Sequence, residues 1–313
     1  MVPGVTTLLT FPGQGAQRPG MLHALPDHAA VRRTLDQTST VLGEDVLALD
    51  DAHRLASTVS VQLCLLAAGT AMARCLLEEG AHADAVAGLS IGAFPAAVVA
   101  GVLDYADAVR LVALRGRLME EAYPEGHGMT AILGLEQAAL ERVVAQVHDA
   151  GAPVYLANLN APTQFVVAGA LPALARVGAL ALEVGAHGAR PVAIAVPSHC
   201  PLLAPQAEAL RAAFAGVALR RPALQYFSAS AARQLRDPAR IGADLAGNMA
   251  TPVRWHETMQ LARETGVALA VEVPPGNVLT RLAAGMFDEA VACADMRRDS
   301  VMLLMARYRG RDD

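Results

Sequence analysis

A serine between two glycines, in the stretch Gly88-Leu89-Ser90-Ile91-Gly92, is the first feature of this sequence that could do chemistry. The spacing G-x-S-x-G is typical of a nucleophile on a sharp turn between a strand and a helix. The context fits, because a short apolar run over 85–89 precedes the serine and a helical pattern follows it. There the Ile91 N–H would lie at a helix N-terminus, where it could stabilise an oxyanion. A turn of small residues in an alanine-rich chain is the alternative.

A serine nucleophile needs a base at neutral pH, and His199 is the best candidate among the nine histidines. It lies in the sequence VPSHCP, where flanking prolines fix the backbone and exclude a regular helix. His256, beside Trp255, is a weaker candidate. The other seven histidines have polar or loop-like surroundings, which are typical of solvated side chains. An ordinary loop histidine is the alternative for His199.

Arg115 is the third candidate, because it lies on an apolar face of a helix predicted over 105–122. Leu111, Arg115 and Leu118 have the spacing i, i+4, i+7 and so share one face, and Asp104 is the expected N-cap. A guanidinium on such a face must be paired, since its unpaired burial is very costly. Two partners remain open: an internal carboxylate in a structural salt bridge, or a substrate carboxylate held by two parallel hydrogen bonds.

The loop FPGQGAQ, residues 11–17, is a second strand-to-loop transition. Its glycines allow the backbone to approach another group closely. It is not the dinucleotide-binding pattern G-x-G-x-x-G, and no acidic residue follows at the distance that pattern requires. It is therefore either a simple turn or the source of a second oxyanion donor, the Gln14 N–H.

Composition excludes several classes of function. The net charge of −5 argues against general nucleic-acid binding, and all 25 basic residues are arginines. Without lysine, neither a Schiff base nor a Walker-type phosphate loop can form. The four cysteines lack metal-binding spacing, so we expect free thiols and no metal. No uninterrupted apolar run of membrane-spanning length and no basic leader occur, so we expect a cytoplasmic protein.

The 313 residues and 54% hydrophobic content predict one large domain with a smaller insertion. In the large domain, strands at 6–11 and 85–89 alternate with helices at 58–78, 91–100 and 105–122, which indicates an α/β fold with a mostly parallel sheet. From 126 to 197 the predicted order is β-α-β-β-α-β, the ferredoxin-like order. Its elements are expected at 129–133, 135–148, 154–159, 164–168, 171–184 and 191–196. The expected domains are therefore 1–125 with 198–313, and 126–197.

Several motifs in order resemble the malonyl-CoA:acyl carrier protein transacylase family over nearly the whole chain. They are FPGQGAQ, GLSIGAF, LRGRLM, GMTAILGL, NLNAPTQFVVAG, PSHC, NMATPVRW and VPPGNVLTRL. The resemblance implies an α/β-hydrolase-like large domain, an inserted ferredoxin-like α+β small domain and a catalytic dyad of Ser90 and His199. It also implies that Arg115 binds the free malonyl carboxylate and that Gln14 and Ile91 supply the oxyanion donors. Asn248 matches the position whose carbonyl orients the histidine, so no triad aspartate is required.

Within this family the sequence is most similar to epsilon subunits of bacterial malonate decarboxylase. Such a subunit is expected to load malonyl from malonyl-CoA onto an acyl carrier protein that bears a dephospho-CoA-derived prosthetic group, with other decarboxylase subunits as possible partners. No permanently bound cofactor is implied. Leu89 and Ala93 stand where relatives in fatty-acid synthesis carry His and Glu, in G-H-S-x-G-E.

Three alternatives remain open at this stage. The same chemistry could serve a fatty-acid or polyketide synthase, and a non-catalytic docking subunit is the alternative of another class. Simple ester hydrolysis would leave Arg115 unexplained. Because carrier proteins are commonly acidic, arginines are the expected docking residues, and the candidates are Arg190, Arg220, Arg221 and Arg281.

Overall fold

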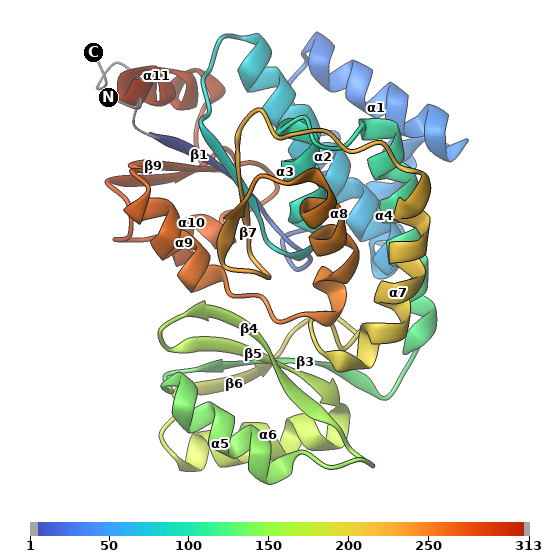
Figure 1. Ribbon diagram of the computed structural model, residues 1–313, viewed down its shortest axis with the longest axis vertical. Helices are drawn as coiled ribbons and strands as arrows, with labels where there is room; N and C mark the ends of the chain where they lie inside the picture. Colours follow the sequence, from blue (N-terminus) through green and yellow to red (C-terminus); the bar gives the residue numbers. More distant parts are fainter. Residues whose placement is uncertain (1–5, 310–313) are drawn as a thin grey trace.

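The computed structural model describes residues 6–309, which form two separate β-sheets, each covered by helices (Figure 1). The larger sheet has the order β10-β9-β1-β2-β7-β8, and every neighbouring pair except β7 and β8 is parallel. This confirms the mostly parallel sheet predicted from the sequence. Its strands are β1 (Thr7–Phe11), β2 (Ala85–Gly88), β7 (Gln225–Ser228), β8 (Arg233–Leu235), β9 (Leu269–Glu272) and β10 (Glu289–Ala292).

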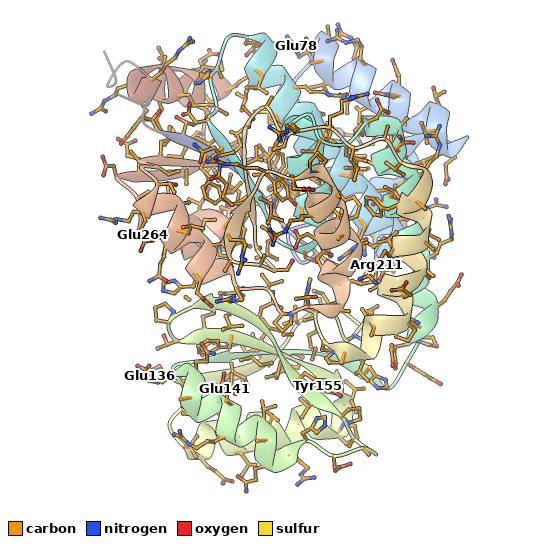
Figure 2. The ribbon with its side chains drawn as sticks, viewed as in Figure 1. Glu78, Glu136, Glu141, Tyr155, Arg211 and Glu264 are labelled. Carbon is orange, nitrogen blue, oxygen red and sulfur yellow. The ribbon has the colours of Figure 1, made fainter. Side chains whose placement is uncertain are left out.

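Helices cover both faces of this sheet because alternate strand residues point to opposite sides. Leu9 and Val86 belong to the core under one group of helices, whereas Leu8 and Ala87 belong to the core on the other face. The first group is α1 (Ala29–Leu42), α2 (Thr58–Glu78), α3 (Ala93–Val99), α4 (Tyr105–Ala122), α7 (Ala204–Ala213), α8 (Pro238–Gly247) and α11 (Arg298–Arg309). The second is α9 (Trp255–Glu264) and α10 (Val278–Leu282). Figure 2 shows side chains filling these layers, with the exposed Glu78 and Glu264 at the periphery.

Helix α2 lies at the centre of the first group of helices, on one face of the large sheet. Among the described residues it is the one helix long and apolar enough to cross a membrane, but 89% of that apolar stretch is buried inside the protein. It packs against α1, α3 and α4, as the core helix of a globular fold does. All four cysteines are free thiols, as predicted, and Cys64 and Cys75 of this helix are buried.

The smaller sheet has the order β4-β5-β3-β6, and all its pairs are antiparallel. Its elements are β3 (His127–Leu133), α5 (Gln137–Val147), β4 (Val154–Ala161), β5 (Gln164–Ala170), α6 (Leu171–Glu183) and β6 (Gly188–Pro191). This confirms the predicted ferredoxin-like order. In Figure 1, α5 and α6 cover one face of the sheet and the other face is turned toward the large sheet.

Two predictions about local structure were wrong in detail. The last strand of the smaller sheet is β6, Gly188–Pro191, and not 191–196. The Val192 N–H still bonds the Met129 carbonyl of β3, but the chain then bends and leaves the ladder, because the Ile194 N–H bonds the Val192 carbonyl instead of a neighbouring strand. The predicted helix over 91–100 begins as a 3-10 turn, Ser90–Gly92, before α3. Residues 1–5 and 310–313 of the expected large domain lie outside the described residues.

Candidate active site

Ser90 lies on a tight turn between β2 and α3. Its φ is +57°, a left-handed conformation that costs about 1–2 kcal/mol for a residue other than glycine. The two glycines of the motif are required because neither position has room for a Cβ atom. A Cβ at Gly88 would lie 2.0 Å from the Gly92 carbonyl, and a Cβ at Gly92 would lie 2.1 Å from the Phe11 carbonyl oxygen. The sequence context therefore builds the turn that presents a G-x-S-x-G serine.

His199 lies beside Ser90, with 2.8 Å between its Nε2 atom and the Ser90 Oγ. Its Nδ1 atom is 2.7 Å from the backbone carbonyl of Asn248, and a carbonyl can only accept a hydrogen bond. Nδ1 must therefore carry the proton, which leaves the Nε2 lone pair free to accept the Ser90 proton. His256, the other candidate base, lines a separate hollow with Glu136 and Phe165.

The environment of His199 keeps its ring neutral. Burial, and to a smaller extent the positive charge of Arg115, lower the pKa of His199 to about 4. The carbonyls of Asn248 and Thr251 oppose this shift by accepting from the ring. A neutral imidazole with a free Nε2 is the form that can act as a general base.

Arg115 completes the cluster from α4. Only 1% of the residue is exposed, and its guanidinium donates to Gln62 Oε1 at 2.7 Å, Asn248 Oδ1 at 3.1 Å and Ser90 Oγ at 3.3 Å. All three acceptors are neutral. Its Nε–H has no partner among the described residues, and burial lowers the pKa of Arg115 to about 9.

Arg115 has no carboxylate partner among the described residues. No ion pair between Arg115 and a carboxylate is present among residues 6–309, so the structural salt bridge is not formed there. Because the buried Arg115 contacts only neutral groups, it can bind the carboxylate of a ligand without first breaking an ion pair inside the protein. The geometry therefore favours an anionic ligand next to Ser90.

Asn248 links these three residues, and its side chain was not predicted to do so. The carbonyl expected to face His199 does face it, at 2.7 Å. The side-chain amide also accepts from Arg115 and donates to the Ser90 carbonyl at 3.2 Å. Backbone and side chain of one residue thus fix the positions of the candidate base, nucleophile and cation.

A cavity of about 250 Å³ opens above Ser90 and His199, between the two sheets. Gln14, from the FPGQGAQ loop, lines this cavity, while Ile91 is buried directly after Ser90. The face of the smaller sheet supplies the opposite wall through alternate residues of β3, β4 and β5: Met129, Ala131, Asn158, Asn160, Gln164 and Val166. No aspartate or glutamate is among the lining residues.

Three polar residues of the site were missed by the sequence analysis. Gln62, which accepts a hydrogen bond from Arg115, is an amide in the second turn of the apolar helix α2, and a lone amide among apolar residues was a usable signal. Asn158 and Asn160 are 6% and 9% exposed, and their Oδ1 atoms have no partner within the described protein. Their spacing of two along β4 places both on the cavity face.

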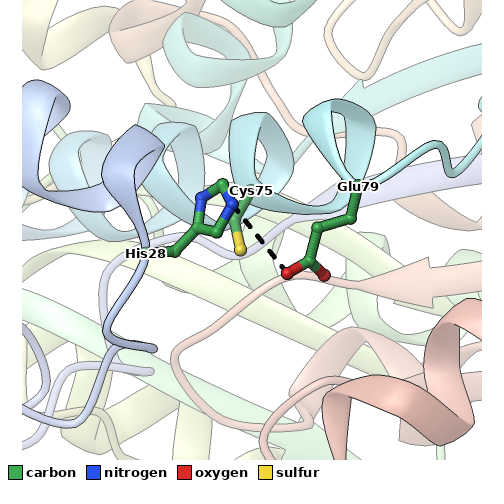
Figure 3. A group of neighbouring side chains, drawn as sticks. All are labelled: His28, Cys75 and Glu79. Atoms are coloured by element: carbon green, nitrogen blue, oxygen red, sulfur yellow. Dashed lines mark ion pairs between the residues drawn. The ribbon is translucent and has the colours of Figure 1, made fainter.

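A group of metal-ligand types lies outside this site. His28, Cys75 and Glu79 bring one donor atom each within 4.8 Å of one another (Figure 3). His28 Nδ1 accepts from the Ala30 N–H at the start of α1, so the neutral ring carries its proton on Nε2, which faces Glu79. Arg298 Nε lies 3.2 Å from Glu79. Helix capping and ion pairing therefore explain the group without a metal.

The comparisons with known proteins agree with this geometry. Residues 9–309 match the model of the acyl transferase domain family. The malonyl CoA-acyl carrier protein transacylase of Haemophilus influenzae is 39% identical over 281 residues, which cover 88% of this chain and 90% of that protein.

Two solved structures are similar over nearly their whole length. FabD from Acinetobacter baumannii superimposes with a TM-score of 0.92 at 34% identity, covering 97% of this chain and 99% of that one. A malonyl-transacylase solved with a type II polyketide acyl-carrier protein gives a TM-score of 0.88 at 36% identity, covering 96% and 98%.

Proposed function

Because this chain belongs to the acyl transferase domain family, we propose that it is a malonyl-CoA:acyl carrier protein transacylase that works through a malonyl-Ser90 intermediate. The observation that carries the proposal is one cluster. Ser90 Oγ lies 2.8 Å from the free nitrogen of a neutral histidine and 3.3 Å from a buried arginine that has no carboxylate partner within residues 6–309. A nucleophile, a base and a carboxylate receptor are what malonyl transfer requires.

In the first half-reaction, His199 Nε2 takes the Ser90 proton as Oγ attacks the thioester carbonyl. The carbonyl oxygen becomes an oxyanion, and the backbone N–H groups of Gln14 and Ile91 stabilise it. In comparable sites one such donor is worth about 3–4 kcal/mol. The intermediate then collapses, the bond between carbon and sulfur breaks, and the departing CoA sulfur takes the proton from His199.

In the second half-reaction, the thiol of a carrier protein enters and the same steps run in reverse. His199 takes the thiol proton, the sulfur attacks the malonyl ester, and Ser90 leaves with the proton. Arg115 selects the acyl group, since an acetyl group would leave the buried guanidinium without its counter-ion. This arrangement of Ser90 and His199 does not favour the alternative of a non-catalytic subunit that only docks a carrier protein.

Two carriers are candidates for the acceptor. The similar proteins are named malonyl CoA-acyl carrier protein transacylases, and one was solved with a polyketide carrier, which favours a fatty-acid or polyketide carrier. Leu89 and Ala93, which depart from G-H-S-x-G-E, favour the malonate decarboxylase carrier with its dephospho-CoA-derived group. Incubating the isolated malonyl-enzyme with each carrier, and measuring which one discharges it faster, separates the two.

The acyl-enzyme itself is tested by intact-protein mass spectrometry after mixing with malonyl-CoA. We expect a malonyl adduct on the unmodified protein and none on Ser90→Ala. Ser198→Ala is the matched control, because the hydroxyl of this second serine in the cavity donates to the Val196 carbonyl instead of to a histidine. An adduct that survives Ser90→Ala would refute the proposal.

A further inference from the structure

The stretch of chain 248–251, called here the orienting segment, carries the contacts that hold His199 as a base. Asn248 at its start and Thr251 at its end each place a main-chain carbonyl against His199 Nδ1, at 2.7 Å and 3.2 Å. The Asn248 side chain also accepts from Arg115. Because a carbonyl orients the ring only from the position in which the chain holds it, whatever fixes this segment also fixes the base.

Both ends of the orienting segment are tied to the end of β7. After the segment, the Arg254 N–H donates to the Ala229 carbonyl at 2.7 Å. Before it, on the last turn of α8, the Asp244 carboxylate accepts from the Ser228 hydroxyl at 2.8 Å, and Figure 1 shows α8 beside β7. The first tie joins two backbone groups and is open to any sequence, whereas the second depends on two side chains.

Ser228 can anchor the segment because it belongs to the same sheet as the nucleophile turn. It is the last residue of β7 and pairs with Gly88, two residues before Ser90, in the neighbouring strand β2. Only 1% of Ser228 is exposed. Its oxygen accepts from the Ala231 N–H at 3.0 Å, which leaves its own proton for Asp244. The bond between the two side chains therefore ties the orienting segment to the strand next to the nucleophile.

One helical turn connects Asp244 to Asn248. The Asn248 N–H, at the C-terminal end of α8, bonds the Asp244 carbonyl, so a shift of one residue is passed to the other. Among the described residues, those that shift the pKa of His199 are Arg115, Asn248 and Thr251. Asp244 is not one of them, so it can act on the ring through position and not through its charge.

We propose that Asp244 is a positioning residue for acyl transfer, which acts through Ser228 on the orienting segment. Its bond to Ser228 keeps the two carbonyls of the segment in line with His199 and keeps the Asn248 amide beside Arg115. This role rests on the proposed function, since acylation is the reaction that the bond would support. A displacement of about 1 Å in such a site can slow a reaction by roughly 10².

The test breaks the bond from either side. Ser228→Ala removes the donor and Asp244→Ala removes the acceptor, whereas Asp244→Asn keeps an oxygen that can accept. We expect each alanine variant to lower kcat/KM for malonyl-CoA by roughly ten- to a hundredfold, and Asp244→Asn to keep it. The double alanine variant should be no slower than the slower single one, because both substitutions remove the same bond. Ser228→Ala removes a single oxygen and carries the test if Asp244→Ala does not fold.

The preference for malonyl separates positioning from a general loss of structure. The ratio of kcat/KM for malonyl-CoA over acetyl-CoA should fall in the alanine variants, since Asn248 holds Arg115, whereas a smaller folded fraction would lower both rates equally. Asp237→Ala is the matched control, because this exposed carboxylate caps the other end of α8 by accepting from the Arg240 N–H. We expect it to lower the free energy of unfolding in urea and to leave kcat/KM and the ratio unchanged.

A fluorophosphonate gives a readout that does not need malonyl transfer, because it forms a bond between phosphorus and the Oγ of a base-activated serine as fluoride leaves. Labelling of Ser90 should slow in the alanine variants and stay unchanged in Asp244→Asn. Alanine variants as active as the unmodified protein, an unchanged ratio, effects that add in the double variant, or an Asp244→Asn as slow as Asp244→Ala would overturn the positioning role. An unmodified protein that takes no malonyl while its Ser90 is labelled would instead refute the proposed function.

Discussion

Replacing Arg115 by methionine separates the gain in selectivity from the cost in stability that this residue brings. Methionine keeps an unbranched, flexible apolar stem and removes the guanidinium group with its charge. Arg117→Met is the control, because Arg117 is exposed on the same helix. Two quantities are expected to change in a defined way: the preference for malonyl over acetyl, and the free energy of unfolding.

The loss of selectivity follows from the two hydrogen bonds that a guanidinium forms with one carboxylate. A hydrogen bond to a charged group is worth about 1.5–3 kcal/mol, so two are worth about 3–6 kcal/mol. The ratio of kcat/KM for malonyl-CoA over acetyl-CoA should therefore fall by roughly 10² to 10⁴.

The free energy of unfolding of the variant should fall only slightly or rise. Burial lowers the pKa of Arg115 from 12.5 to about 9, a difference that corresponds to about 5 kcal/mol against the charged form at neutral pH. Methionine removes that cost. It also leaves Gln62 Oε1 and Asn248 Oδ1 without a donor, at about 1–3 kcal/mol each. The net effect lies between a loss of about 1 and a gain of about 3 kcal/mol.

The assay combines stopped-flow acylation by the two thioesters with unfolding in urea. An unchanged ratio of malonyl to acetyl would refute the role given to Arg115 in selectivity. A loss of stability of about 3–5 kcal/mol would show that the arginine belongs to a buried ion pair, since breaking such a pair has that cost. Either result would contradict the reasoning from its neutral contacts.

The remaining predictions concern His199 and the turn at Ser90. The kcat/KM of acylation should rise with pH around pH 4, the pKa of buried His199. In Arg115→Met this rise should move to higher pH, because the positive charge that repels the protonated imidazole is gone. The unfolded histidine takes up its proton near pH 6.5, whereas the folded one stays neutral down to about pH 4. The free energy of unfolding should thus fall over that interval by about 3 kcal/mol, and urea titrations of His199→Gln should lack this part of the fall. Gly92→Ala should abolish acylation by displacing the turn from the Phe11 carbonyl, whereas Gly216→Ala, which meets nothing within 4 Å, should not; equal activities would refute the crowding argument.

Local patterns predicted most of the fold because they carry their own boundaries. The helix α4 begins and ends as predicted, at Tyr105–Ala122, since the Asp104 side chain caps it by accepting from the Ala106 N–H. The apolar segment 191–196 was predicted as a strand, but the ladder ends at its beginning. Val192 and Ile194 are apolar there because they line the cavity.

The contacts of the candidate site were harder to predict. Arg115 meets Gln62 and Asn248 across 53 and 133 residues of sequence, and no local pattern reports such distances. The group that orients His199 is a main-chain carbonyl, which every residue possesses, so the type of residue at 248 carries no signal of it. The resemblance to known sequences supplied that position.

The use of a carbonyl to orient His199 has a consequence for the ligand that the site can hold. An aspartate in that place would put a full negative charge beside a substrate that is itself an anion, and would compete with it for Arg115. The orienting oxygen is neutral, and no acid among the described residues lines the cavity, so a malonyl carboxylate would meet no competing negative charge from these residues at Arg115. In this site, the dyad thus keeps a second negative charge away from the position that an acidic acyl group would occupy.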